Sequence, residues 1–272
     1  MPRGDVARLR AWVFDLDGTL TVANHDFDAI RRELGIPEGH LILEWLAQLP
    51  AARAAPLHAR LQDIEADLAA QVAPQPGGRE LLEALVARGH RIGILTRNSQ
   101  CNAVASLRRI ELLDLFAPED ILGRDEAPAK PDPGGILHLL RRWKSSPGEA
   151  AMVGDFLIDL ETGRNAGVTT VHVDAASGFH WPELTDLAVR SLPELLATLG
   201  EPRTPCRTGS PQTRGKPADA WLRRRPNHRD AGRRNAGRRD ASSPDAGRPD
   251  AGSPDATDRY PARDRRKGGH RP

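Results

Sequence analysis

The most constraining feature of the chain is the segment W-V-F-D-L-D-G-T-L at residues 12–20. An apolar run typical of a buried strand ends there in Asp15 and Asp17, followed by Gly18 and Thr19. Because strand side chains alternate between two faces, the two carboxylates converge only if the chain turns sharply after Asp15. Gly18 permits such a turn and lets backbone N–H groups approach an anion. The segment therefore predicts a site for a phosphoryl group held by Mg²⁺, with one carboxylate attacking phosphorus and the other moving a proton.

An acidic β-turn is the alternative interpretation, since D-G pairs are common in loops, and three further segments decide between the two. A second apolar strand run ends in Thr96, and a third ends in Asp155. Between them Lys130 lies in A-K-P-D-P, and Asp159 follows the third run at the start of a helix. The four parts in this order resemble the haloacid dehalogenase superfamily of hydrolases. The resemblance covers roughly residues 11–200.

Strand and helix patterns alternate along the second part of the chain. Strands are predicted at 91–96, 120–123, 151–154 and 169–173, and helices at 80–87, 102–110, 135–143, 159–166 and from Ser191 onward, where a capping box begins. This alternation predicts an α/β fold with a Rossmann-like, doubly wound parallel sheet. Ligands of such sheets bind beyond the carboxyl ends of the strands, where Asp15, Thr96 and Asp155 are expected to converge.

The stretch 22–75 has a different pattern from the rest of the chain. Helical periodicity recurs there at 26–34, 41–49 and 57–68, and a Pro- and Gly-rich segment closes it. We expect a small α-helical cap at 22–75, placed as a lid. It would be inserted into a core formed by residues 1–21 and 76–200.

The C-terminal stretch 201–272 differs in charge and complexity. Residues 1–200 contain 20 basic and 28 acidic residues, a net charge of −8, whereas 201–272 contain 19 and 9, a net charge of +10. Six pentapeptides such as D-A-G-R-R repeat over 230–259 and carry no large apolar residue, so they cannot bury a core. We expect a disordered, basic, low-complexity tail with at most a weak attraction for nucleic acid. The overall pI near 8.8 is therefore no indication that the folded part binds nucleic acid.

The chain has only two cysteines, Cys101 and Cys206, which fits a reducing compartment rather than a disulfide framework. We expect no signal peptide, because the first apolar run has only four residues, and no later segment approaches ~18 uninterrupted apolar residues. We expect a soluble cytoplasmic protein with no membrane partner.

The resemblance implies a role for each acidic residue of the site. Asp15 would be the nucleophile and form an aspartyl-phosphate, and Asp17 would act as general acid and base. Asp155 would be a metal ligand together with Asp15 and with Asp17, which contributes its backbone carbonyl in this family. Since all these ligands are oxygens and no His or Cys cluster is present, the sequence favours Mg²⁺ over Zn²⁺.

The same resemblance gives Thr96 and Lys130 to the phosphate. Thr96 would donate its hydroxyl to a phosphoryl oxygen, and Lys130 would neutralise charge on that group and on the nucleophile. For Asp159 three readings stay open: ordering of metal-bound water, pairing with Lys130, or a favourable place near a helix N-terminus. Arg97 and His25 are either contacts of the site or exposed residues.

The resulting functional hypothesis is a Mg²⁺-dependent phosphatase that acts on a small phosphorylated metabolite, with phosphoglycolate as the first guess. The alternatives are a sugar phosphomutase of the same superfamily and a non-catalytic phosphate-binding regulatory protein. A halide-releasing dehalogenase is disfavoured by Asp17 and the acid-rich metal site. The insert is small, and after D-G-T-L the chain continues Thr21-Val22-Ala23, whereas many capped members of the superfamily carry an Asp-Ser pair nearby. The substrate subclass is therefore not fixed by these motifs.

Overall fold

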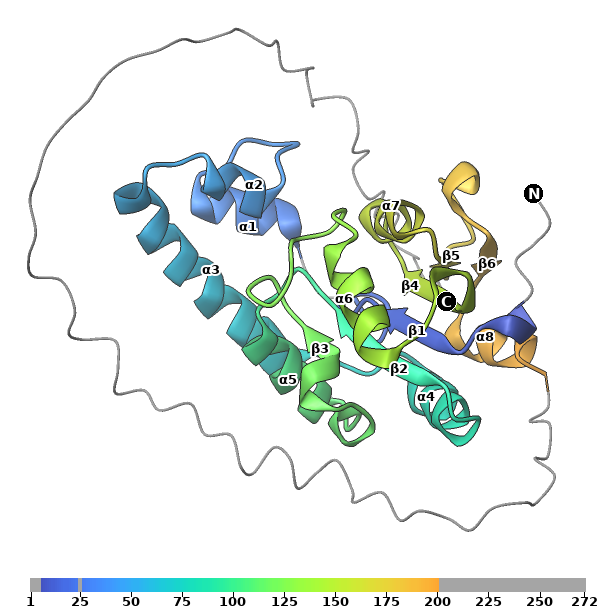
Figure 1. The fold of residues 1–272 in the computed structure, drawn as a ribbon. Helices are drawn as coiled ribbons and strands as arrows, with labels where there is room; N and C mark the ends of the chain where they lie inside the picture. Colours follow the sequence, from blue (N-terminus) through green and yellow to red (C-terminus); the bar gives the residue numbers. More distant parts are fainter. Residues whose placement is uncertain (1–5, 24–25, 201–272) are drawn as a thin grey trace, which may run out of the picture. The chain divides into compact units, whose positions relative to one another are not determined.

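The computed structural model describes residues 6–23 and 26–200, and Figure 1 shows the order of its elements. The predicted tail at 201–272 and His25 lie outside these described residues. The strands are β1 Ala11–Phe14, β2 Arg91–Leu95, β3 Ile121–Leu122, β4 Ala150–Gly154, β5 Thr169–Val173 and β6 Leu187–Val189. The helices are α1 Phe27–Leu34, α2 Ile42–Ala47, α3 Ala51–Gln71, α4 Gly78–Ala87, α5 Gln100–Arg109, α6 Gly134–Trp143, α7 Leu157–Ala166 and α8 Leu192–Thr198.

The six strands form one sheet in the order β3-β2-β1-β4-β5-β6, and every neighbouring pair is parallel. This confirms the predicted Rossmann-like, doubly wound arrangement, whose strand order reverses beside the first strand. Strand β1 pairs with β2 on one side and β4 on the other, so that Phe14 is in register with both Ile94 and Val153. The carboxyl end of β1 therefore lies between those of β2 and β4.

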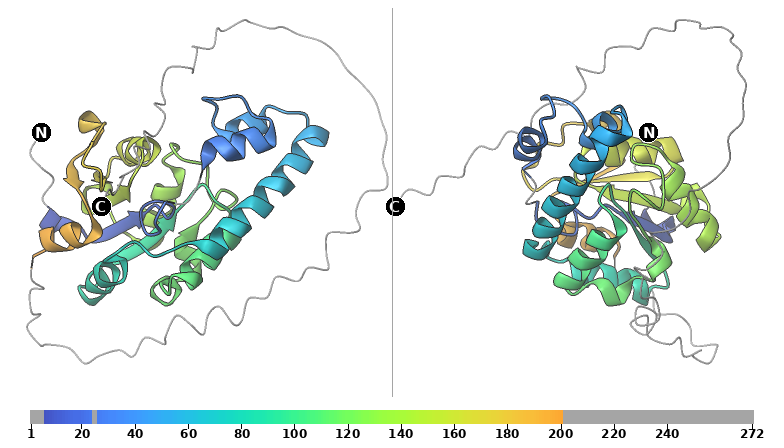
Figure 2. Two further views of the ribbon diagram at one scale, coloured as in Figure 1. Left: turned by 180° about the vertical axis from the view of Figure 1, so that it is seen from behind. Right: turned by 90° about the vertical axis from the view of Figure 1, so that its left-hand side faces the viewer.

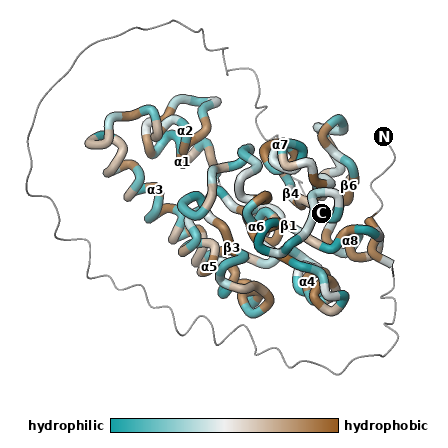
Figure 3. The backbone as a smooth tube through the Cα atoms, viewed as in Figure 1, coloured by the Kyte–Doolittle hydropathy of each residue, from teal (hydrophilic) through white to brown (hydrophobic). Residues whose placement is uncertain are grey.

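Both faces of the sheet are covered by helices (Figure 2). Trp12 and Phe14 of β1 belong to an apolar cluster with residues of α4, α5 and α8, whereas Ala11 and Val13 belong to a second cluster with residues of α6 and α7. All four of these strand residues are fully buried. Burial on both faces explains why the strands are nearly unbroken apolar runs, whereas the helices alternate between hydrophobic and hydrophilic segments (Figure 3).

The structure differs from the expected elements in three places. Strand β6 was not predicted, because its three residues, Leu187–Val189, are too short a run to show a strand pattern. Helix α3 begins at Ala51 rather than near 57 and contains Pro56, which removes a single backbone hydrogen bond near its start. Ser191 caps α8 as predicted, but Glu194 accepts from the backbone N–H of Arg190 rather than from that of the cap residue.

The described residues divide into two compact units. Within the described residues, we call Phe27–His58 the helical unit, and we call 6–23, Asp26 and 59–200 together the core unit. The helical unit contains α1, α2 and the beginning of α3, and the side chains that it buries are apolar: Ile30, Leu34, Ile36, Ile42, Leu46 and Ala54. The cap boundaries at 22 and 75 remain a prediction.

Within the core unit, the segments that flank the insertion run side by side. The backbone N–H of Val22 donates to the carbonyl of Ala73, and that of Gln75 donates to the carbonyl of Leu20, each at 2.9 Å. These contacts tie both ends of the insertion to the turn that follows β1. Among the helices of the described residues, none combines the length and apolar character needed to cross a bilayer.

Candidate active site

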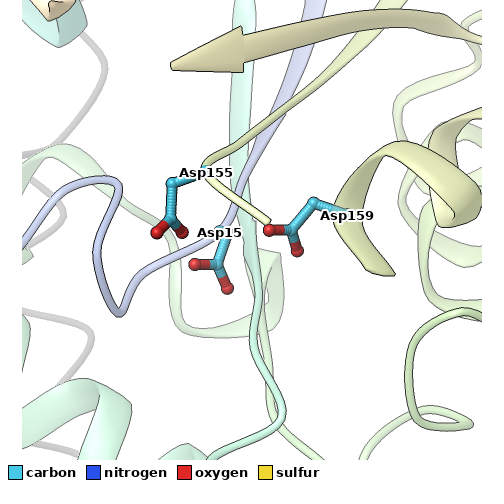
Figure 4. Close-up of side chains that lie close together, drawn as sticks. All are labelled: Asp15, Asp155 and Asp159. Carbon is cyan, nitrogen blue, oxygen red and sulfur yellow. The ribbon is translucent and has the colours of Figure 1, made fainter. Parts of the chain in front are cut away.

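Three carboxylates meet at the carboxyl edge of the sheet. Asp15 follows β1, Asp155 follows β4, and Asp159 lies in the first turn of α7. One oxygen of each lies within 4.8 Å of the others, and Figure 4 shows the three side chains directed toward one another. The convergence predicted for Asp15 and Asp155 is therefore present in the structure, and Asp159 joins them.

The turn after β1 brings the backbone very close to Asp155. Gly18 has a φ of +104°, and a Cβ atom at this position would lie 2.5 Å from Oδ2 of Asp155. The Thr19 hydroxyl donates to Oδ1 of the same carboxylate at 3.4 Å. A glycine is thus required at position 18 both for its backbone conformation and for the close approach.

Lys130 is the cation of this cluster. It is 2% exposed, and its Nζ donates to Oδ1 of Asp15 at 2.5 Å and to Oδ1 of Asp159 at 2.6 Å. Burial alone would lower the pKa of Lys130, but the two carboxylates outweigh this effect and hold the pKa above its usual value. Lys130 therefore stays charged beside Asp15, as its predicted role requires.

Asp159 satisfies two of the readings left open by the sequence. It pairs with Lys130, and its Oδ2 also accepts from the backbone N–H of Phe156 at the start of α7. The carboxyl is 1% exposed, and burial raises its pKa to about 6 against the opposing effect of Lys130. A Cβ atom on Gly154 would lie 2.2 Å from Cβ of Asp159, so this packing requires a glycine at the end of β4.

Asp17 and Thr96 contact each other. The Thr96 hydroxyl donates to Oδ2 of Asp17 at 3.2 Å and accepts from the backbone N–H of Asn98 at 3.0 Å. Asp17 is half-buried, and Thr96 is 3% exposed. This contact brings a strand-end hydroxyl to the carboxylate predicted to move the proton, and the role of Thr96 toward phosphate remains a prediction.

The donor chemistry of the cluster fits a hard divalent cation. Three carboxylates face one ammonium group, so their formal charges leave an excess of two negative charges for a cation to balance. All the donors are oxygens, the ligand type that Mg²⁺ prefers. The side chains that cluster are those of Asp15, Asp155 and Asp159, whereas the predicted ligand set has Asp17, through its backbone carbonyl, in place of Asp159. The ligand assignment stays a prediction.

His172 was missed in the sequence. His172 lies on β5 in register with Gly154 and is 1% exposed. The centroid of its ring lies 5.6 Å from that of Phe179 and 5.4 Å from that of Trp181. Burial lowers the pKa of His172, against the effects of Asp174 and of a hydrogen bond to the backbone of Asp155. A histidine between two valines in a predicted strand was the available signal.

The chain matches the family model for haloacid dehalogenase-like hydrolases over residues 9–167, more than half of its length. It belongs to this family. The matched range includes all four parts on which the resemblance was based, with Asp15, Asp17, Thr96, Lys130, Asp155 and Asp159.

Two curated proteins and one solved structure are similar to this haloacid dehalogenase-like hydrolase. An uncharacterized hydrolase of Saccharomyces cerevisiae is 31% identical over 195 residues, covering 69% of this chain and 89% of the yeast protein. The phosphoglycolate phosphatase of Rhodospirillum rubrum is 30% identical over 220 residues, covering 71% and 90%. The crystal structure of a phosphatase of the same superfamily from Thermococcus onnurineus superposes with a TM-score of 0.54 at 25% identity, covering 72% and 100%.

Proposed function

We propose that this hydrolase is a Mg²⁺-dependent phosphatase that cleaves a small phosphomonoester through an aspartyl-phosphate on Asp15. The observation that carries the proposal is the contact of the Lys130 ammonium with Asp15 inside a cluster of three carboxylates. A buried carboxylate held by a fixed cation at a strand end is positioned for nucleophilic attack rather than for solvation at a surface.

The first chemical step uses Asp15 and Asp17. A carboxylate oxygen of Asp15 forms a bond to phosphorus, the bond from phosphorus to the ester oxygen breaks, and the departing oxygen takes a proton from Asp17. Lys130 stabilises the negative charge that develops on the transferring group. The contact of Asp17 with the Thr96 hydroxyl orients its carboxylate for this transfer.

The second step restores the enzyme. Asp17, now a carboxylate, takes a proton from water, and the water oxygen attacks the phosphorus of the aspartyl-phosphate. The acyl-phosphate bond breaks, inorganic phosphate leaves, and the carboxylate of Asp15 is regenerated. A Mg²⁺ ion bound by Asp15, Asp155 and their neighbours would supply further neutralisation of the phosphoryl oxygens.

Phosphoglycolate is our first candidate substrate. The R. rubrum relative, which this chain matches over 90% of its length, is named for that activity. The two cysteines of the chain lead us to propose a reducing, cytoplasmic location.

The test is release of inorganic phosphate from a panel of phosphorylated metabolites that includes phosphoglycolate. We expect turnover with added Mg²⁺, none with EDTA, and inhibition by excess Ca²⁺, which is larger and tolerates looser coordination. Full turnover in the presence of the chelator would contradict the metal requirement. Analysis of the products of the same reactions separates the alternatives. A phosphomutase converts a sugar phosphate to its isomer without releasing phosphate, and a regulatory protein binds phosphate without turnover.

A further inference from the structure

Arg97 directly follows the proposed phosphate-binding residue Thr96, but its guanidinium contacts another loop. The Nη1 atom of Arg97 donates to the backbone carbonyl of Lys130 at 2.6 Å. The two residues are separated by 33 positions in the sequence, and they belong to the loops that follow β2 and β3. Arg97 thus joins the loop that carries Thr96 to the loop that carries the catalytic cation.

The main chain at Arg97 is contacted in turn by Arg124. The Nη1 atom of Arg124 approaches the carbonyl of Arg97 at 3.5 Å, and the backbone N–H of Arg124 donates to the carbonyl of Asn98 at 3.0 Å. The guanidinium of Arg124 is fixed in turn by Glu65, which lies in the part of α3 that belongs to the core unit.

The contact between Glu65 and Arg124 is a buried, bidentate ion pair. Nη1 and Nη2 of Arg124 donate to Oε1 and Oε2 of Glu65 at 2.6 and 2.8 Å, and each side chain is 10% exposed. Asn102 adds a hydrogen bond from Nδ2 to Oε2 of Glu65 at 3.4 Å. Parallel N–H···O bonds fix the orientation of both groups, so this pair is a rigid support rather than a loose surface contact.

We propose that Arg97 is a positioning residue for Lys130 and that Glu65, through Arg124, holds Arg97 in place. The inference rests on the proposed function, because it takes Lys130 to be the cation of the phosphoryl site. The role of Arg97 is therefore to set where the ammonium group stands between Asp15 and Asp159, not to contact the substrate.

The residue types fit this role. An arginine side chain presents several donors in a planar group. One of them, Nη1, reaches the Lys130 carbonyl, while the main-chain carbonyl of Arg97 accepts from Arg124. A lysine at position 97 would offer a single ammonium on a more flexible stem. Because small displacements of a catalytic group are costly, loss of the clamp should reduce the rate of the chemical step more than substrate affinity.

The first variants are Arg97→Met, which removes the donor, and Arg97→Lys, which retains a positive charge. The matched control is Arg109→Met, an exposed arginine in the last turn of α5. With p-nitrophenyl phosphate and Mg²⁺ we expect Arg97→Met to lower kcat by ~10- to 100-fold with little change in KM. Arg97→Lys should recover part of this loss, and Arg109→Met should match the wild type.

A second measurement reports on Lys130 without turnover. Lys130 is 2% exposed and Lys144 is exposed, and they are the two lysines of the described residues. Acetylation of the full-length protein by N-hydroxysuccinimidyl acetate, followed by mass spectrometry of the peptides, gives the labelling ratio of Lys130 to Lys144. We expect Arg97→Met to raise this ratio severalfold and Arg109→Met to leave it unchanged.

Glu65 is tested by non-additivity. Glu65→Gln should change kcat and the labelling ratio in the same direction as Arg97→Met but less, because it acts through two contacts. The double variant should be no worse than Arg97→Met alone, since both changes break the same chain of contacts. Fully additive losses would show that Glu65 acts by another route.

The outcomes distinguish this inference from the proposed function. If Arg97→Met lowers only the thermal midpoint, while kcat and the labelling ratio stay at the wild-type values, Arg97 is merely structural and the proposal is wrong. If the wild type releases no phosphate from any ester, the proposed function fails, and the labelling ratio still decides whether Arg97 positions Lys130.

Discussion

The core unit and the helical unit treat polar side chains in opposite ways. Among the described residues, all of the buried polar and charged side chains belong to the core unit, including Asp15, Thr96, Lys130 and Asp159. The side chains buried in the helical unit are apolar. Buried polar groups are costly unless they are satisfied, and in the core unit Asp15, Lys130 and Asp159 satisfy one another. In the helical unit no polar or charged residue of the described part is fully buried, although Nε of Arg31 is shielded from solvent.

The largest effect should come from the nucleophile. Asp15→Asn removes the attacking oxygen and a metal ligand, and we expect phosphate release to fall by several orders of magnitude. The thermal midpoint should stay close to that of the wild type, since Lys130 retains Asp159 as a partner. Asp28→Asn, an exposed acid of α1 in the helical unit, is the matched control and should leave the rate unchanged. Phosphate release by Asp15→Asn within tenfold of the wild-type rate would exclude the covalent mechanism.

The second effect concerns Asp17. Asp17→Asn should lower turnover of an alkyl phosphate by ~10²–10⁴-fold, the usual contribution of general acid–base catalysis. The loss should be smaller with p-nitrophenyl phosphate, whose leaving group needs little protonation. Steady-state rates on both esters provide the measurement, and equal losses would remove the proton-transfer role from this residue.

Much of the site in the core unit could be predicted from the sequence, because the carboxyl ends of parallel strands meet at one edge of the sheet. Once three apolar runs are taken as neighbouring buried strands, Asp15, Thr96 and Asp155 are placed together by topology alone. The alternation of strand and helix patterns likewise predicted the fold class, and of the six strands only the short β6 was not predicted.

The supporting contacts could not be predicted, since they depend on packing between distant segments. Glu65 and Arg124 are separated by 59 positions, and neither lies in a pattern that indicates an ion pair. Arg97 was left open between a substrate contact and an exposed residue, because a sequence does not show which way a loop side chain turns. The same holds for His172, whose burial follows from the rings of Phe179 and Trp181.

The third prediction tests whether the helical unit contributes only packing. Leu46→Ala removes a fully buried side chain of α2 and should destabilise that unit by about 2–5 kcal/mol. Turnover of p-nitrophenyl phosphate at 25 °C should change little, because every residue assigned to the chemistry lies in the core unit. Differential scanning calorimetry and initial rates are the two readouts. A tenfold loss of turnover at a temperature where the variant is folded would show that the helical unit completes the site.

The smallest effect concerns a polar contact of the core unit outside the carboxylate cluster. The Trp12 indole N–H donates to Nδ1 of His90 at 3.1 Å, a bond that requires this nitrogen to be unprotonated. Burial, followed by the nearby charges of Arg10 and Arg88, lowers the pKa of His90 below its usual value of 6.5. The unfolded chain therefore binds a proton at a higher pH than the folded protein does, and the contribution of His90 to stability is present above pH 6.5 and is lost as the pH falls below it.

His90→Gln isolates this contribution, because a glutamine amide oxygen accepts from the Trp12 indole at every pH. Other titrating groups, including Asp159, are shared by the two proteins, so they cancel in the difference between the thermal midpoints. We expect the wild type to lose a few degrees relative to His90→Gln between pH 8 and pH 5, since a partly exposed histidine contributes only modestly. A difference that stays constant across this range would mean that His90 keeps an ordinary pKa. Among the buried side chains of the described residues, the shifted pKa values would then be those of Lys130, Asp159 and His172, which would sharpen the contrast between this edge of the sheet and the rest of the core unit.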